Sequence, residues 1–478
     1  MPFEISDLKI CNFLKYLFIL LIFASGIFIY SCANQLPPSG GDDDKTPPKV
    51  LKITPKPNST MFKGNSITIE FDKYVDRRSL RESFFISPKP NIEPEFDWGA
   101  KKVEIKFQEP LKNNKTYSFL ITKGFKDYLG NLLNEPIQFA ISTGDSIDNG
   151  KISGKVYSKN LNNIIIFAYS LSGKNDTLIN PLKISPEYIT QVNEIGVYSF
   201  NHITKENYRI FALKDVNKNM VYDKGIDEIS VLNSDISLDS SEDIRNINFV
   251  FGDIIPDDKF CYSAPFVNTF SPDSANYIFS SIKNHEKEIT VKPRFFLHFK
   301  DNKINKYDIA DNIKLFDSTN NKFYKIVLNW IADTLLEMFP VEKLSYSSEY
   351  KLTIDLRNTQ RKYLYQLNFT SADEKRFGKI SGFISDKFVI PRTVYVKLFP
   401  KSNNLYIYSQ SLDADSIFTF YNLMEGEYNI FSFIDENGNG IYDSGAAYPY
   451  KPSEKFFIFE PALNLKGNWS IDNVIIRF

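Results

Sequence analysis

Two short segments place carboxylate and amide side chains at a spacing that suits a hard cation. They read Asp215-Val-Asn-Lys-Asn-Met-Val-Tyr-Asp223-Lys-Gly225 and Asp435-Glu-Asn-Gly-Asn-Gly-Ile-Tyr-Asp443-Ser-Gly445. Ca²⁺ requires oxygen ligands, and side chains at positions 1, 3, 5 and 9 of such a loop point toward one centre. Ca²⁺ is therefore the one cofactor that the sequence suggests. The candidate ligands are Asp215, Asn217, Asn219, Asp223, Asp435, Asn437, Asn439 and Asp443.

A second interpretation of the same segments needs no metal. A calcium loop usually supplies a bidentate Glu at position 12, where this chain has Ile226 or Ala446. Position 6 is Gly440 in the second segment but Met220 in the first, where a sharp turn costs more. Asp and Asn side chains commonly accept hydrogen bonds from nearby backbone N–H groups in turns. We favour this Asx-turn interpretation, and we expect any bound metal to stiffen the loop rather than to catalyse.

Cys32 is the other residue with predicted chemistry. Lys9 and Lys15 precede an uncharged, apolar stretch of 15 residues, 16–30. This length and this flank are typical of a signal peptide, whereas a membrane-spanning helix needs about 20 apolar residues. The stretch ends in Ile29-Tyr30-Ser31-Cys32, which resembles a bacterial lipobox. The resemblance implies a signal peptide over residues 1–31 and a lipid on Cys32; an ordinary secretory signal and an uncleaved anchor helix are the alternatives.

The segment after Cys32 indicates where the mature protein is held. Residues 32–45 are rich in Pro, Gly and Asp, so they cannot bury themselves and are expected to form a flexible tether. The Cys-Ala-Asn start, the Pro-rich spacer and the following Thr46-Pro-Pro resemble surface or periplasmic lipoproteins of the Bacteroidota. No Asp follows Cys32 directly, which by analogy with other Gram-negative lipoproteins implies the outer membrane, on its periplasmic or its surface-exposed face.

Residue types that carry catalysis are sparse. The three histidines, His202, His285 and His298, are far apart and lack the spacing of metal ligands. Cys261 has no histidine near it in the sequence, and no nucleophile elbow or phosphate-binding loop occurs. The chain is therefore predicted not to be an enzyme. Its 57 Lys and Arg residues balance 58 Asp and Glu residues, which disfavours nucleic acid as a partner.

Composition and internal repetition predict the architecture that must hold these residues. The 478 residues include 42 Phe and 27 Tyr, which favour strands, and they are too many for a single core. Gly150-Lys-Ile-Ser-Gly154 recurs as Gly378-Lys-Ile-Ser-Gly382, and residues 200–225 align without gaps on 420–445 with ten identities in 26 positions. The repeat predicts four domains in an A-B-A-B order: domain 1 (46–146), domain 2 (147–255), domain 3 (256–374) and domain 4 (375–478).

Short strands with period-two alternation fill the first of these domains. Ser66-Ile-Thr-Ile-Glu-Phe71 and Lys102-Val-Glu-Ile-Lys-Phe107 each put apolar side chains on one face and polar ones on the other. Such strands separated by turns predict an all-β fold of tandem antiparallel β-sandwiches, with a β-barrel as the alternative.

Motifs in domains 1 and 3 resemble those of a known family. Ile69-Glu-Phe-Asp, the segment 111–117, Asp127-Tyr-Leu-Gly-Asn131 and Phe139-Ala-Ile-Ser-Thr-Gly144 together resemble a bacterial Ig-like domain of the S-layer-protein type. Domain 3 has Arg357-Asn-Thr-Gln-Arg361 in place of the Asp-x-x-Gly-Asn turn, so it resembles a degenerate copy.

The B domains resemble a different module. Gly378-Lys-Ile-Ser-Gly382, Asp415-Ser-Ile-Phe-Thr-Phe420 and Leu423-Met-Glu-Gly-Glu-Tyr428 resemble the transthyretin-like regulatory module of carboxypeptidases. Relatives of that fold include starch-binding domains, but a fold does not carry its function with it.

Two main hypotheses of function follow, beside a third in which the chain is a hydrolase. The first is a lipid-anchored, non-enzymatic envelope scaffold that binds an unidentified envelope protein, as a subunit of an outer-membrane assembly. The alternative is a carbohydrate-binding surface lipoprotein in which exposed tyrosines stack on the sugar rings of a glycan. The tyrosines considered for stacking are Tyr169, Tyr198, Tyr406 and Tyr408. Aromatic residues of β-sandwiches mostly lie in the core, which is the competing explanation for all four.

Overall fold

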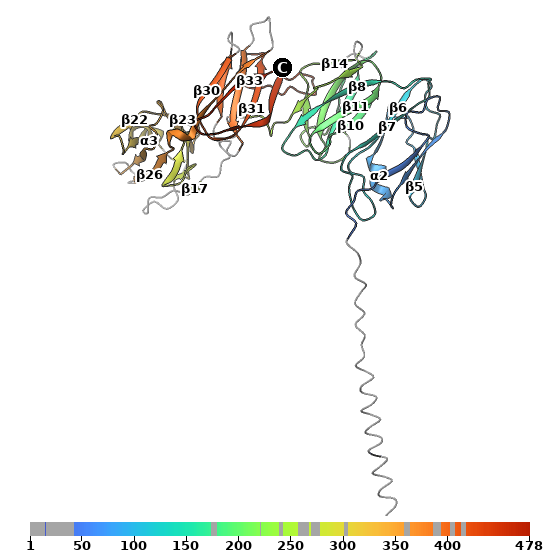
Figure 1. Ribbon diagram of the computed structural model, residues 1–478, viewed down its shortest axis with the longest axis horizontal. Helices are drawn as coiled ribbons and strands as arrows, with labels where there is room; N and C mark the ends of the chain where they lie inside the picture. Colours follow the sequence, from blue (N-terminus) through green and yellow to red (C-terminus); the bar gives the residue numbers. More distant parts are fainter. Residues whose placement is uncertain are drawn as a thin grey trace, which may run out of the picture. The chain divides into compact units, whose positions relative to one another are not determined.

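The computed structural model describes most of the chain after the predicted signal peptide (Figure 1). The described residues are Lys15 and 43–173, 179–219, 221–238, 242–256, 267–268, 278–300, 305–357, 364–385, 393–401, 407–412 and 417–478. The chain forms two units, Met1–Pro47 and Pro48–Phe478, and the strands lie in the second. Among the described residues, no helix is both long and apolar enough to span a bilayer. Cys32, Cys261, Met220 and Tyr406 lie outside the described residues.

Domain 1 consists of two antiparallel sheets and one short helix. The first sheet has the order β1(Val50–Thr54)-β2(Ser66–Phe71)-β5(Lys102–Lys106)-β4(Glu95–Trp98). The second has the order β3(Phe84–Ser87)-β6(Thr116–Ile121)-β7(Ile137–Ser142). Asp76 caps helix α2(Arg77–Ser83), because its carboxylate accepts a hydrogen bond from the Ser79 N–H at 2.7 Å. The predicted alternation is confirmed, since Ile67, Ile69 and Phe71 are all buried.

Domain 2 has a larger and a smaller sheet. The larger has the order β10(Tyr188–Gln191)-β9(Ile164–Ser170)-β12(Asn207–Lys214)-β13(Glu228–Val231), and β14(Ile236–Ser237) also pairs with β12. The smaller has the order β11(Val197–Ile203)-β8(Gly150–Tyr157)-β15(Asp243–Ile244). Strand β16(Phe249–Val250) pairs with β8 in parallel.

Domain 3 repeats the helix of domain 1 and enlarges its sheets. One sheet has the order β17(Val267–Asn268)-β18(Ile278–Ser280)-β20(Phe295–Phe299)-β24(Leu335–Pro340)-β23(Ile326–Ala332). The other has the order β19(Glu286–Ile289)-β26(Leu364–Ser371)-β25(Glu349–Asp355)-β21(Ile313–Asp317)-β22(Lys322–Tyr324). Helix α3(Lys306–Asn312) precedes β21 as α2 precedes β3, and the 3₁₀ helix η3(Glu374–Arg376) leads into domain 4.

Domain 4 repeats the sheets of domain 2. The sheet β29(Tyr408–Leu412)-β28(Thr393–Pro400)-β31(Gly426–Asp435)-β32(Phe456–Leu465) has the strand order of β10-β9-β12-β13. The sheet β30(Ile417–Met424)-β27(Phe377–Ile384)-β33(Ser470–Ile476) corresponds to β11-β8-β15, and its last pair is again parallel. The pairing of strands thus follows the sequence repeat.

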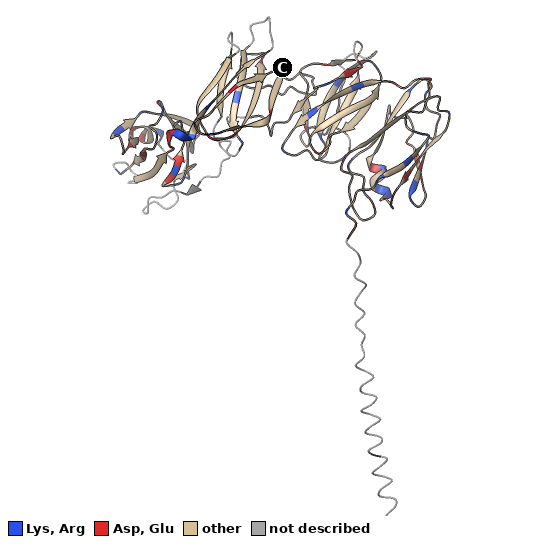
Figure 2. Cartoon of the chain, viewed as in Figure 1, with Lys and Arg blue, Asp and Glu red and all other residues tan. Residues whose placement is uncertain are grey.

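Each domain is built around its own hydrophobic cluster, as a tandem arrangement of sandwiches requires. Lys and Arg are interspersed with Asp and Glu along the described ribbon (Figure 2). The predicted all-β fold of tandem antiparallel sandwiches is confirmed, with few helices between the strands.

The repeated Gly-Lys-Ile-Ser-Gly motif begins the central strand of the smaller sheet in domains 2 and 4. A Cβ atom on Gly154 would lie 1.8 Å from the backbone oxygen of Ile247, and one on Gly382 would lie 2.1 Å from that of Val474. Both glycines therefore let the neighbouring parallel segment cross close to the strand, and this requirement explains why the motif recurs.

Candidate functional site

The two Asp/Asn segments are corresponding loops at the ends of corresponding strands. Loop 1 (215–227) follows β12, and loop 2 (435–454) begins at the last residue of β31. Asp215 and Asp435, the first residues of the two loops, are both buried. The structure thus brings the predicted residues together in two separate groups of four, one in each B domain.

Hydrogen bonds within loop 1 engage all four predicted residues. The Asn219 N–H donates to Asp215 Oδ1 at 3.2 Å. The amide groups of Asn217 and Asn219 both donate to Asp223 Oδ2, at 3.0 and 2.8 Å. Asn219 Oδ1 accepts from the Val221 N–H at 3.0 Å. The Asp and Asn side chains therefore hold the loop as a series of Asx turns.

Loop 2 repeats this pattern with more backbone donors. Asp435 Oδ1 accepts from the N–H groups of Gly438 and Asn439, at 2.7 and 3.2 Å, and Asp435 Oδ2 accepts from that of Gly440 at 2.8 Å. The amide of Asn437 donates to Asp443 Oδ2, and that of Asn439 lies 3.4 Å from the same oxygen. Gly438 and Gly440 have φ angles of 76° and 72°, which favour glycine at these positions.

A further carboxylate closes each loop, and the sequence alignment did not reveal it. Asp227 accepts from the Val216 N–H at 3.0 Å and from the Asp223 N–H at 2.8 Å. Glu454 accepts from the corresponding groups of loop 2, Glu436 N–H at 2.9 Å and Asp443 N–H at 3.0 Å. The two residues play one role at different distances along the chain, so spacing could not identify them. The sequence signal was limited to Asp227, the acid at the end of loop 1.

The carboxylates of loop 2 influence one another. Burial raises the pKa of Glu454, and the nearby charges of Asp435 and Asp443 raise it further, although hydrogen bonds from two backbone N–H groups oppose this shift. Among the described residues, no three His, Cys, Asp or Glu side chains form a group that could hold a metal ion. The observed hydrogen bonds are those that the Asx-turn interpretation requires, and Ca²⁺ binding stays a prediction.

Ala447 and Tyr450 of loop 2 contact domain 2. The ring centroid of Tyr450 lies 3.6 Å from the guanidinium carbon of Arg209. The same guanidinium donates two hydrogen bonds to the Asp235 carboxylate, at 2.8 and 2.7 Å. Ala447 and Tyr450 pack with Phe211 in one apolar cluster. Loop 2 therefore positions a contact between the two B domains.

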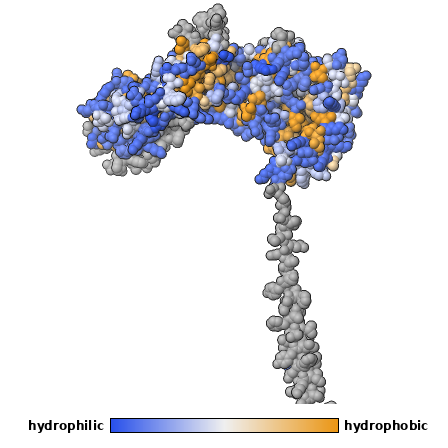
Figure 3. Space-filling view, in the orientation of Figure 1, coloured by the Kyte–Doolittle hydropathy of each residue, from blue (hydrophilic) through white to orange (hydrophobic). Residues whose placement is uncertain are grey.

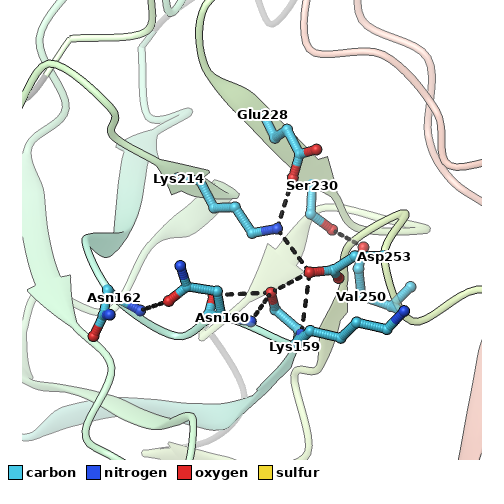
Figure 4. A network of polar contacts seen from close by, with 9 residues as sticks. Lys159, Asn160, Asn162, Lys214, Glu228, Ser230, Val250 and Asp253 are labelled. Atoms are coloured by element: carbon cyan, nitrogen blue, oxygen red, sulfur yellow. Dashed lines mark hydrogen bonds and ion pairs between the residues drawn. The ribbon is translucent and has the colours of Figure 1, made fainter.

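A polar network lies beside a cavity of about 470 Å³ that residues of both B domains line. The Lys214 ammonium donates to Glu228 at 2.7 Å and to Asp253 at 3.1 Å, and Asp253 also accepts from Ser158 and from the Lys159 N–H (Figure 4). Both signs of charge and aromatic rings line the cavity, including Lys159, Asp253, Lys401, Phe431 and Glu460. No histidine or cysteine is among the described residues that line it.

Two of the tyrosines considered for glycan stacking are not exposed, so that expectation is wrong for them. Tyr169 is 1% exposed and Tyr198 is 2% exposed. Tyr198 belongs to the core of domain 2, whereas Tyr169 packs in the cluster that Ala447 and Tyr450 of domain 4 help to cover. Tyr408 is half-buried, and this burial raises its pKa to about 12.

Comparison with known proteins identifies one part of the chain. Residues 44–143 match the family described as bacterial Ig-like domain. This part of the chain is therefore similar to a bacterial Ig-like domain. The match covers domain 1 from β1 to β7, whose residues carried the corresponding resemblance.

Similar solved structures include proteins of several kinds. Domains 1–6 of the surface layer protein SbsC share 9% identity, cover 88% of this chain and 68% of their own, and have a TM-score of 0.18. The TIE protein of Bacillus anthracis shares 10% identity over 92% of this chain and 75% of its own, with a TM-score of 0.14. An L,D-transpeptidase from Mycobacterium smegmatis shares 16% identity over 34% and 76%, with a TM-score of 0.17. No curated protein matches the sequence.

Proposed function

We propose that this chain is a lipid-anchored protein of the bacterial outer membrane, on its periplasmic or surface face, that acts as a non-enzymatic scaffold for an envelope assembly. One observation carries the proposal. A lipobox-like segment ending at Cys32 and a Pro-rich tether directly precede a bacterial Ig-like domain and further β-sandwiches. In this arrangement Cys32 fixes the protein to the membrane, and the domains extend from that point to an envelope protein partner.

Contacts between consecutive domains support the role of a spacer. Gln138 of domain 1 donates to Thr190 of domain 2 at 2.6 Å, and Tyr346 of domain 3 donates to Asn422 of domain 4 at 2.9 Å. The Arg376 guanidinium of domain 4 also forms an ion pair with the Glu288 carboxylate of domain 3. Such contacts between neighbours restrict the bending of a tandem array and keep its partner surfaces at a set distance from the anchor.

The B domains fit the proposal as transthyretin-like modules, and domains 1 and 3 as Ig-like modules of the S-layer type. The matched strand orders and the two close-approach glycines support a common origin for domains 2 and 4. The glycan-binding alternative has lost Tyr169 and Tyr198 as stacking residues, because their rings are buried. The scaffold is therefore the hypothesis that we retain.

The test combines a substitution at the proposed lipid site with a search for the partner. In cells, the Cys32→Ser variant is expected to leave the membrane fraction while keeping its fold, and Cys261→Ser, the matched control, is expected to stay in that fraction. Chemical cross-linking in cells followed by affinity purification should recover one recurring envelope protein with the wild type and much less of it with Cys32→Ser. Cys32→Ser protein that remains in the membrane pellet after a salt wash would contradict the anchor.

A further inference from the structure

One end of domain 1 exposes a group of large apolar side chains. Tyr74, Tyr128, Leu129 and Leu132 are 59%, 82%, 67% and 53% exposed, and we call these four residues the apolar tip. Strands place two separate loops side by side here, because the Tyr128 N–H donates to the Tyr74 backbone oxygen at 3.0 Å. Apolar patches are also visible among hydrophilic residues on the face of domain 1 seen in Figure 3. Large apolar residues gathered at one place on a surface commonly mark a contact site.

The fold holds the apolar tip outward rather than leaving it loose. Buried Asp127 accepts from both the backbone N–H and the side-chain amide of Asn131, at 2.9 and 2.8 Å. Gly130 has a φ angle of 93°, which a turn of this kind needs. Phe125 and Leu133, on either side of the turn, are buried in the core. Exposure of Tyr128 and Leu129 is thus a product of a well-anchored turn, and turning them into the core of domain 1 would break it.

The apolar tip lies at the end of domain 1 where the chain enters from the tether. The first residue of β1, Val50, pairs with Phe71, the last residue of β2, and Tyr74 follows three residues later. The Lys49 N–H donates to Asp72 Oδ1 at 2.8 Å, which fixes the entry point beside this loop. The corresponding turn position of domain 3 reads Arg357-Asn-Thr-Gln-Arg361, which is hydrophilic in sequence. The apolar residues therefore occur in the domain that follows the tether and not in its repeat.

We propose that the apolar tip inserts into the interfacial region of the lipid bilayer and forms a second membrane contact beside the lipid on Cys32. This inference rests on the proposed lipid anchor. Tyr side chains favour the membrane–water interface, where the ring is buried and the hydroxyl stays wet, and leucines gain by leaving water. The Lys101 ammonium lies 5.7 Å from the Tyr74 ring centroid, so a cation accompanies the apolar group and suits anionic headgroups.

Connectivity selects the bilayer over other occupants. An extended chain advances at most about 3.6 Å per residue, so the 17 residues from Cys32 to Lys49 keep the entry point of domain 1 within about 60 Å of the lipid on Cys32. The bilayer surface is therefore present at high effective concentration for every anchored molecule, whereas a second copy or a partner must first diffuse to it. A contact of domain 1 with the bilayer would add apolar burial to the attachment through Cys32 and would orient domain 1 at the membrane surface.

The test uses tryptophan fluorescence of the full, lipidated protein in vesicles of phosphatidylethanolamine and phosphatidylglycerol brominated near the headgroups. Leu129→Trp places a reporter in the apolar tip, and Ile195→Trp places one at an equally exposed position of domain 2 (67%). Wild-type protein gives the background of the three native tryptophans. We expect loss of the added fluorescence at position 129 and no loss at position 195. In vesicles without bromine, both reporters should fluoresce at full intensity.

The other outcomes reject the second membrane contact. Flotation of the same samples shows whether the second contact or the lipid anchor has failed. Protein that floats with the vesicles while the reporter at position 129 is not quenched would overturn the second contact and leave the lipid anchor intact. Protein that fails to float would instead overturn the anchor. A blue-shifted, unquenched reporter at position 129 that depends on protein concentration would assign the apolar tip to a second copy of the chain. In the double variant Tyr128→Ser/Leu129→Ser, a Tyr74→Trp reporter should lose most of its quenching.

Discussion

Replacing Gly154 with alanine should destabilise the smaller sheet of domain 2 while leaving the stability of the other domains unchanged. The added Cβ atom would lie 1.8 Å from the backbone oxygen of Ile247. No rotamer change can relieve this clash, because neither atom moves when a side-chain χ angle turns. The same Ile247 oxygen accepts a hydrogen bond from the buried Tyr198 hydroxyl at 2.7 Å. The segment must move away from β8, and that bond is strained with it.

The magnitude follows from two contributions. Forcing an extra carbon into a packed site costs about 1–3 kcal/mol, and losing a buried hydrogen bond costs about 1 kcal/mol more. A total of about 3 kcal/mol corresponds to roughly a hundredfold change in the opening equilibrium of the sheet. Gly252→Ala is the matched control in the same domain, because its Cβ would meet nothing within 4 Å, and its effect should stay within about 0.5 kcal/mol.

Hydrogen exchange measured by mass spectrometry reads this effect out locally in the full chain. Peptides that cover β8, β11 and β16 should lose about a hundredfold in protection in Gly154→Ala, whereas peptides of domain 4 should not change. Gly382→Ala should produce the mirror result in domain 4, because its Cβ would lie 2.1 Å from the Val474 oxygen. Unchanged protection in Gly154→Ala would refute close backbone approach as the reason for the repeated motif.

Three further predictions concern a turn, a buried tyrosine and the loops. Asp127→Ala should destabilise domain 1 by about 1–3 kcal/mol by removing the Asn131 hydrogen bonds. Burial would raise the pKa of Asp127, but those bonds and Lys73 hold it below its ordinary value. The melting temperature of the wild type should therefore exceed that of Asp127→Ala by its full amount above about pH 4, and the difference should disappear as the pH falls through the native pKa. Tyr169→Ala should destabilise domain 2 by about 3 kcal/mol or more, whereas Tyr128→Ala should change stability by less than about 0.5 kcal/mol. Equal chemical denaturation curves for the two variants would contradict the burial of Tyr169. If the loops bind Ca²⁺, calorimetric titration should give heat that Asn437→Ala reduces, and no heat at millimolar metal would reject calcium binding.

Local patterns in the sequence were sufficient for the strands and for the repeat. Period-two alternation in residues 66–71 predicted β2, because one face of that strand lies on a core and the other on water. The duplicated Gly-x-x-x-Gly motif predicted that domains 2 and 4 correspond, and the structure supplies the reason in a close backbone approach. The helices α2 and α3 were not predicted, because seven-residue helices are too short to show a 3.6-residue period.

Features that depend on distant segments could not be predicted. All seven residues of β9 are buried, because domain 4 and the segment around Ile179 cover the outer face of the sheet that carries Tyr169. Tyr198, in contrast, alternates inward with Phe200, a pattern that the sequence did contain. The carboxylates that close the two loops, Asp227 and Glu454, come from unequal distances along the chain, which only folding makes equivalent.

The chemistry at Cys32 decides the central proposal most directly. Mass spectrometry of the N-terminal peptide of the protein purified from membranes measures both the start of the mature chain and any lipid on it. The lipid anchor predicts a peptide that begins at Cys32 and carries a thioether-linked diacylglyceryl group. A peptide that begins at Ala33 or further on, or one that contains Cys32 without a lipid, would contradict it.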